Sequence, residues 1–244
     1  MRNTLVIATL ALLLPAVGFA AGGHVKLEKA KVDLTDQASL QRGAKYYVNY
    51  CMACHSLGHL RYSRMADDLG IDDQSLRENL LFGDAQPTDM MTNSMRPSDG
   101  EAWFGTAVPD LTLVTRWRSP DWVYTYLKSY YVDPSRPYGV NNVIFPLVGM
   151  PHVLGDLQGV QEPIMHTPKG GGEPSVTGVT LTQAGVLTPN EYDSMVRDIT
   201  AFLTYAGEPS ALERRRMGIY VLLFLGLLFI LTYALKKEYW KDVH

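Results

Sequence analysis

Cys51-Met52-Ala53-Cys54-His55 (CMACH) is the stretch of this sequence that decides its fold. Two cysteines separated by two residues and followed at once by a histidine form the C-x-x-C-H signature of covalent haem attachment. The spacing suits that chemistry because two thiols can add to the two vinyl groups on one porphyrin edge while the next residue presents an imidazole to the iron. The sequence therefore predicts one covalently bound haem c, attached through Cys51 and Cys54, with His55 as an iron ligand.

A C-x-x-C pair also occurs in zinc sites and in redox disulfides, and the rest of the chain disfavours both. A structural zinc site needs two further ligands at similar spacing, whereas the chain has only 2 cysteines. A thioredoxin-type pair sits in a βα context, which is absent here.

An amphipathic helix is predicted immediately before the motif. Its apolar positions recur at i, i+4, i+7, i+8 and i+11, which is one face of an α-helix. These positions are Leu40, Ala44, Tyr47, Val48 and Cys51. This helix therefore ends at the haem.

A second helix is predicted towards the C-terminus. Thr188 as N-cap, Pro189 in the first helical position and Glu191 form a capping box, and Gly207 and Pro209 end the helix. Its apolar stripe comprises Tyr192, Met195, Ile199, Phe202 and Leu203.

The N-terminus has the layout of an export signal. Arg2 precedes an apolar stretch over residues 5–19, which is broken by Pro15 and followed by small residues at Ala20 and Ala21. This pattern predicts a secretory signal peptide over residues 1–20, and the stretch is short for a membrane span.

A second apolar stretch, over residues 217–235, carries no charge and is long enough to span a membrane. Three arginines (214–216) precede it and three lysines follow it, so basic residues do not decide its orientation. Export decides it instead, and places a haem domain over residues 21–213 in the periplasm of a bacterium. A cytoplasmic tail over residues 236–244 would follow the transmembrane anchor in the inner membrane.

The predicted periplasmic domain is acidic, with 15 Lys and Arg against 23 Asp and Glu over residues 21–213. Such a charge suits a basic protein partner through electrostatic steering, although it equally serves solubility. We expect no nucleic-acid partner.

Several further segments resemble the cytochrome c1 family, the haem c subunits of the cytochrome bc1 complex. Gly43 and Tyr47 match the small and aromatic pair on the first helix of class I cytochromes c. In that family the pair crosses the C-terminal helix at an apolar residue and an aromatic residue, and Ile199 and Phe202 resemble these two. The other matching segments are Met95-Arg96-Pro97, Ala107-Val108-Pro109-Asp110-Leu111-Thr112, Val148-Gly149-Met150-Pro151 and Arg214-Arg215-Arg216-Met217-Gly218. The chain departs from the family in having one proline before Asp110, and in a glycine-rich loop over residues 169–172 that resembles nothing in it.

This resemblance implies a mainly α fold. We expect a class I cytochrome c-like haem domain with long loop insertions and one C-terminal transmembrane helix. It also implies a function as a one-electron carrier of quinol–cytochrome c reductase, assembled with cytochrome b and the Rieske iron–sulfur protein. The haem would pass its electron to a soluble cytochrome c or another periplasmic acceptor, with no bond chemistry of its own.

The sixth iron ligand is expected to be a methionine. A thioether would raise the reduction potential, and a filled position would leave no room for a substrate, so the site would transfer electrons without bond chemistry. The resemblance favours Met195, seven residues before Phe202, and Met150 is the alternative because Pro151 could position its sulfur. His152 and His166 are further candidates, and the alternative for each is an ordinary loop histidine.

The haem propionates need partners. Arg118 resembles the arginine that binds a propionate in this family, and Arg116 is its alternative. Trp103, Trp117 and Trp122 are expected to pack around the haem, and Trp122 could contact a propionate.

Two other functions stay open at this point. One is a membrane-anchored cytochrome c that donates directly to a terminal oxidase. The other is a haem-based sensor, which would need a labile or missing sixth ligand.

Overall fold

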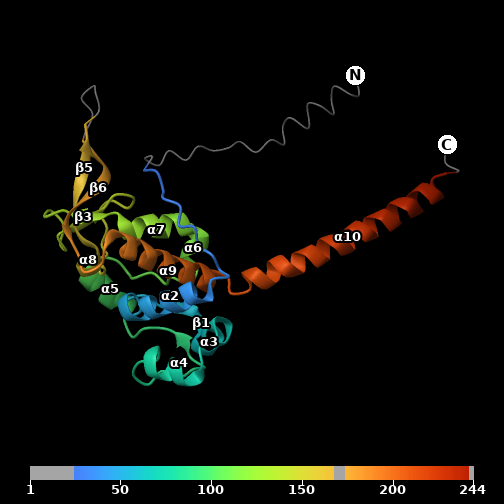
Figure 1. Cartoon of the computed structure of the whole chain (residues 1–244), viewed down its shortest axis with the longest axis horizontal. Helices are drawn as coiled ribbons and strands as arrows, with labels where there is room; N and C mark the ends of the chain where they lie inside the picture. Colours follow the sequence, from blue (N-terminus) through green and yellow to red (C-terminus); the bar gives the residue numbers. More distant parts are fainter. Residues whose placement is uncertain (1–24, 168–173, 242–244) are drawn as a thin grey trace.

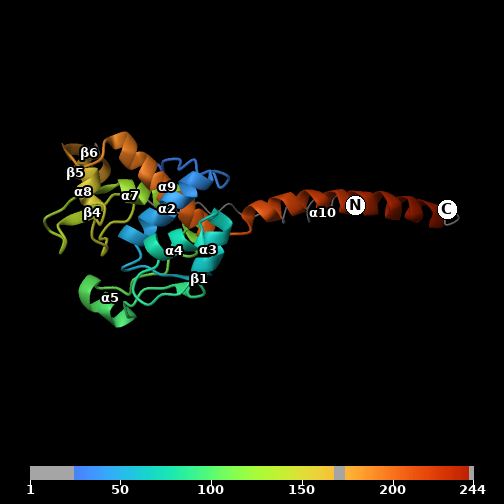
Figure 2. The same cartoon turned by 60° about the horizontal axis from the view of Figure 1, so that its bottom comes forward.

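The domain is built on two crossing helices, α2 (Gln37–Tyr50) and α9 (Pro189–Gly207), which lie side by side in both views of the computed structural model (Figures 1 and 2). The structure describes residues 25–167 and 174–241. The Asp36 side chain caps α2 by accepting from the Ser39 N–H. The predicted capping box starts α9, where the Thr188 hydroxyl accepts from the Glu191 N–H and the Glu191 carboxylate accepts from the Thr188 N–H.

The crossing of α2 and α9 depends on Gly43. A Cβ at this position would lie 2.1 Å from the Asp198 carbonyl oxygen and 2.7 Å from Phe202 Cβ. One turn later, the rings of Tyr47 and Phe202 pack with their centroids 5.6 Å apart. Phe202 is therefore at the crossing, as predicted, whereas the atom nearest to Gly43 belongs to Asp198 rather than to Ile199.

Shorter elements connect the two long helices. The helices are α3 (Tyr62–Leu69), α4 (Asp73–Asn79), α5 (Pro97–Phe104), α6 (Val114–Trp117), α7 (Pro120–Lys128) and α8 (Gly155–Gln158). The strands are β1 (Leu57–Arg61), β2 (Met90–Met91), β3 (Tyr130–Val132), β4 (Val140–Asn142), β5 (Gly159–His166) and β6 (Ser175–Ala184). Within the described residues they pair as three antiparallel ribbons, β1–β2, β3–β4 and β5–β6. The fold is thus mainly α with long insertions between the core helices, as predicted.

The largest insertion forms a β-hairpin instead of an irregular loop. Strands β5 and β6 pair from Gly159↔Ala184 to His166↔Ser175 and project from the domain (Figure 1). Alternating Val and Thr residues in β6 suit a strand, because β-branched side chains fit a pleated surface. The glycine-rich segment over residues 169–172 lies outside the described residues.

Helix α10 (Ala211–Tyr239) extends away from the domain in both views (Figures 1 and 2). Its most apolar 18-residue window has a mean hydropathy of 2.4 and is 0% buried. At 1.5 Å per residue the helix is roughly 43 Å long, more than a hydrocarbon core. The helix therefore includes the predicted span, the three arginines before it, and Lys236 and Lys237 after it in one continuous element. The predicted signal peptide, over residues 1–20, lies outside the described residues.

Candidate haem site

A cavity of about 580 Å³ lies beside the end of α2, between α6, α7, α9 and the loops that precede α6 and α8. This volume is within the range of small-molecule and cofactor pockets. Most of its wall is apolar, from residues that include Leu111, Val123, Leu127, Val148, Ile199 and Leu203. The predicted residues Cys51, His55, Arg118 and Met150 also line it.

The CMACH motif forms the turn that ends α2. Both the Cys54 N–H and the His55 N–H donate to the Cys51 carbonyl oxygen, at 3.1 and 2.9 Å. Cys51 is buried in the cavity wall, and Cys54 is half-buried one turn later. The turn therefore presents a thiol and an imidazole to the same cavity.

The His55 ring is oriented by a backbone carbonyl. Its Nδ1 lies 2.8 Å from the Pro109 oxygen, and in the tautomer that donates from Nδ1 its Nε2 is left free to bind a metal. The carbonyl is itself held in place, because the Asp110 carboxylate accepts from the N–H groups of Gly58 and Thr112, each at 2.7 Å. The Ala107–Thr112 segment thus fixes the orientation of the His55 ring.

Burial sets the protonation of both groups. It lowers the pKa of His55 below its usual value of 6.5, although the Pro109 carbonyl and the Asp110 charge oppose the shift. It raises the pKa of the Cys51 thiol to about 12, with a further contribution from Cys54. Burial therefore favours the uncharged forms of both groups, and a neutral imidazole is the form that binds a metal.

The two candidate methionines lie in different environments. Met150 is in the cavity wall, where the Tyr126 hydroxyl lies 3.5 Å from its Sδ. Met195 is 3% exposed in the apolar core and is not among the described residues that line the cavity. The cavity-lining side of α9 begins one turn later, at Ile199. The geometry therefore favours Met150 over Met195, against the preference drawn from the sequence.

Arg118 has an unused donor at the cavity. Its guanidinium lies over the rings of Trp117 and Trp122, 3.9 and 4.9 Å from their centroids. Its Nε is buried and has no hydrogen-bond partner among the described residues. Arg116, by contrast, pairs with Glu208 at 2.8 Å and does not line the cavity. An anionic group in the cavity would satisfy Arg118.

Some of the remaining predicted residues line the cavity and others do not. Trp117 and Trp122 line the cavity, whereas Trp103 is 60% exposed on α5 and lies outside its wall. His152 stacks on Tyr130 and bonds Gln158 through Nε2 at 2.7 Å. Burial lowers its pKa to about 4, despite the Gln158 contact. His166 is exposed at the end of β5, so neither histidine is placed as an iron ligand.

Sequence reasoning assigned no role to several residues of the site, among them the following three. Tyr126 and Phe145 line the cavity, and Pro109 orients His55. Only Pro109 carried a signal, since it lies within a segment already singled out.

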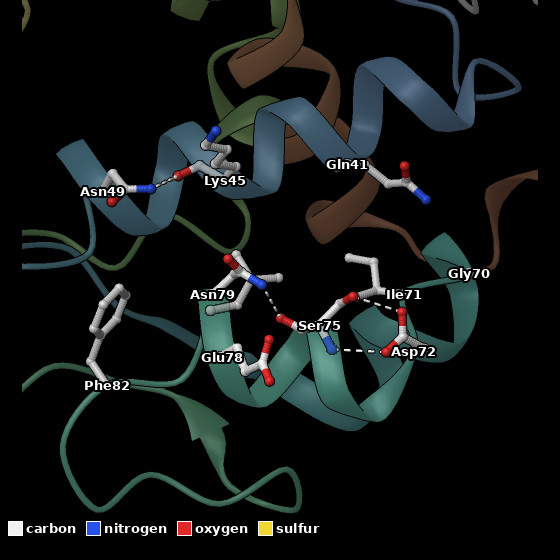
Figure 3. A pocket seen from close by; sticks show the side chains of 11 residues that line it. Gln41, Lys45, Asn49, Gly70, Ile71, Asp72, Ser75, Glu78, Asn79 and Phe82 are labelled. Atoms are coloured by element: carbon white, nitrogen blue, oxygen red, sulfur yellow. Dashed lines mark hydrogen bonds between the residues drawn. The ribbon is translucent and has the colours of Figure 1, made fainter.

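A second hollow, of about 510 Å³, separates α2 from α4 (Figure 3). Its labelled side chains are mostly polar. Gln41, Lys45 and Asn49 come from α2, and Ser75, Glu78 and Asn79 come from α4. None of the predicted site residues lines it. The haem chemistry therefore belongs to the first cavity alone.

Comparison with known proteins identifies the family. The profile of the Cytochrome C1 family matches residues 28–160 and 183–243. The chain belongs to this family. Residues 161–166 of β5 and 175–182 of β6 lie between the two matched segments, so most of these two strands is outside the family profile.

Individual relatives cover nearly the whole chain. Cytochrome c1 of Allochromatium vinosum is 67% identical over 243 residues, which are 98% of this chain and 99% of the relative. The ammonia monooxygenase gamma subunit of Nitrosomonas europaea is 44% identical, over 96% of this chain and 95% of that protein. Among solved structures, a chain of a hyperthermophilic respiratory complex III aligns with 100% of this chain and 98% of its own length, at 14% identity and a TM-score of 0.47.

Proposed function

We propose that this chain is the haem c-bearing electron-transfer subunit of a membrane-bound quinol–cytochrome c reductase. The observation that carries the proposal is a single cavity lined by Cys51, His55 and Met150. The Pro109 carbonyl orients the His55 imidazole in this cavity. Haem c, when bound, supplies a one-electron couple. The chain itself binds the haem, sets its reduction potential and exposes its edge to redox partners.

Cys51 and Cys54 would hold the porphyrin through two thioether bonds, and His55 would bind the iron through Nε2. The hydrogen bond from Nδ1 fixes the ring orientation and raises the basicity of Nε2. Buried apolar side chains such as Leu127, Ile199 and Leu203 exclude water from the remaining faces.

Met150, rather than Met195, is the sixth ligand in this proposal. Its sulfur lies at the cavity, and its thioether favours ferrous iron and a high potential. A filled sixth position leaves no site for oxygen or another small molecule. This arrangement supports electron transfer and argues against the haem-sensor alternative.

Arg118 would hold a haem propionate. Its buried, unpartnered Nε fits this role, and Trp117 and Trp122 hold the guanidinium in place. A fixed positive charge near the iron also disfavours the ferric state, which again raises the potential.

Electrons would enter from a Rieske iron–sulfur protein and leave to a soluble cytochrome c. Exposed apolar side chains lie in the cavity wall, with Leu113 52%, Phe145 41% and Trp117 74% exposed. They give redox partners a surface close to the haem edge, as a short-lived electron-transfer contact requires. Cytochrome b is the expected neighbour of α10 in the membrane.

The haem domain would lie in the periplasm. A topology reporter fused at Pro209, before α10, should show a periplasmic location. The same reporter fused after residue 244 should show a cytoplasmic location. A periplasmic reporter at the C-terminus would contradict a single crossing.

Purification from solubilised membranes tests the complex directly. An affinity-tagged chain should bring down a cytochrome b and a Rieske protein in equal amounts. Ubiquinol should reduce the haem in this preparation, and soluble cytochrome c should oxidise it. Association with a terminal oxidase in place of these two subunits would establish the direct-donor alternative.

A further inference from the structure

The hydroxyls of two tyrosines form a chain of contacts that leads to the sulfur of Met150. Tyr126, on α7, lines the cavity and places its hydroxyl oxygen 3.5 Å from Met150 Sδ. Tyr130, at the start of β3, is 1% exposed and places its hydroxyl oxygen 2.7 Å from that of Tyr126. A thioether sulfur accepts and cannot donate, so any hydrogen bond here runs towards the sulfur.

The distances decide the direction of the chain. The Tyr130 hydroxyl has one proton and two acceptors within reach, the Tyr126 oxygen at 2.7 Å and the Met150 carbonyl oxygen at 3.4 Å. The shorter bond takes the proton, which leaves the Tyr126 proton for Met150 Sδ. Because Tyr126 accepts one hydrogen bond while donating another, its hydroxyl is polarised and donates more strongly.

The contact is held from both sides. Asn142 is fully buried, and its Nδ2 donates to the backbone oxygen of Tyr126 at 2.8 Å. Its Oδ1 accepts from the N–H groups of Ile144 and Phe145, which begin the loop that ends at Met150. One amide therefore ties α7 to this loop, and stacking of Trp122 on the Tyr126 ring, 5.0 Å apart at 13°, fixes the phenol.

We infer that the Tyr126 hydroxyl, supported by Tyr130, donates a hydrogen bond to Met150 Sδ and thereby raises the reduction potential of the haem. The inference rests on the proposed function, which makes Met150 an iron ligand. A hydrogen bond to sulfur withdraws electron density from the lone pair that binds iron. The ferric ion loses more stabilisation than the ferrous ion because it carries the higher charge. Tyr126 is thus a positioning residue that acts on the iron through Met150.

Tyr126→Phe removes the donor and keeps the ring that stacks on Trp122. In a potentiometric titration of the full-length holoprotein, the ratio of reduced to oxidised haem should fall by about three- to ten-fold at a fixed potential. A tenfold change in a one-electron equilibrium corresponds to about 59 mV. Tyr130→Phe should lower the potential by less, because Tyr126 can still donate to the sulfur.

Tyr192→Phe is the matched control. Tyr192 is also a buried tyrosine, and its hydroxyl donates to the Leu127 carbonyl oxygen at 2.8 Å instead of to Met150. The Tyr192→Phe variant should lose about as much stability as Tyr126→Phe, and its haem should keep the wild-type reduction potential.

The charge-transfer band of the ferric haem shows whether methionine still binds the iron, and it therefore distinguishes the possible outcomes. The inference requires that Tyr126→Phe keeps the band and lowers the potential. An unchanged or raised potential with the band intact would overturn it, and so would loss of the band, which would make Tyr126 a structural support for the loop. If Met150→Leu keeps the band, the ligand assignment itself is wrong.

Discussion

Replacing Gly43 by alanine tests the crossing of α2 and α9, on which the cavity depends. The added Cβ would lie 2.1 Å from the Asp198 carbonyl oxygen and 2.7 Å from Phe202 Cβ. The nearest atom belongs to the backbone of a helix and cannot rotate away, so the helices must separate by about 1 Å to reach normal contact distance. Overpacking of this kind costs about 1–3 kcal/mol, and we expect the upper end of that range.

The helix propensity of alanine opposes part of this cost, by about 1 kcal/mol. The net loss should therefore be roughly 1–2 kcal/mol. For a protein of this size that corresponds to a fall in Tm of about 2–8 °C. Thermal unfolding of the purified holoprotein, followed by circular dichroism and by haem absorbance, measures it.

Gly178→Ala provides the control for the Gly43 prediction. Gly178 lies in β6, and its Cβ would meet only Ile164 Cδ1, at 3.5 Å, which is an ordinary contact. Its Tm should stay near that of the wild type. A Gly43→Ala protein as stable as this control would refute the close approach of α2 and α9.

The remaining predictions concern the haem and its loop. Arg118→Gln should lower the reduction potential because it removes a positive charge beside the haem, whereas Arg116→Gln, on the surface, should not; potentiometric titration compares the two. Cys51→Ser and Cys54→Ser should each leave little or no haem-stained protein on a denaturing gel, and staining equal to wild type would disprove attachment. Asn142→Leu leaves two loop N–H groups without their acceptor and should cost roughly 2–4 kcal/mol in chemical unfolding; a change below about 0.5 kcal/mol would show that the loop does not depend on Asn142.

Features that depend on local sequence could be predicted. The CMACH turn, the capping box at Thr188 and the end of α9 at Gly207 involve residues within a few positions of one another. The long apolar segment was also readable, because its length and composition alone distinguish it.

The different surroundings of the two candidate methionines could not be predicted from the sequence. Helical periodicity places Met195 on the buried side of α9 together with Ile199, but it does not say what packs against each turn. In the structure Ile199 lies at the cavity and Met195 lies in the core. Met150 lies in a loop without periodicity, and its position depends on partners far along the chain, such as Tyr126.

The β5–β6 hairpin was missed for a different reason. Its strands hold Gly178 and Pro163, which weaken a strand prediction, and the expected fold had long loop insertions without stated bounds. The alternation of Val and Thr in β6 was the signal that could have revealed it.

The identity of the sixth ligand tests the account most directly, through absorption spectra of Met150→Leu and Met195→Leu. We predict that Met150→Leu loses the ferric methionine charge-transfer band, binds carbon monoxide when reduced and has a sharply lower potential. Met195→Leu should keep a near-normal spectrum and lose less than about 1.5 kcal/mol of stability, because leucine preserves the volume and apolarity of the core. The opposite pair of spectra, with the band lost only in Met195→Leu, would contradict the site described here.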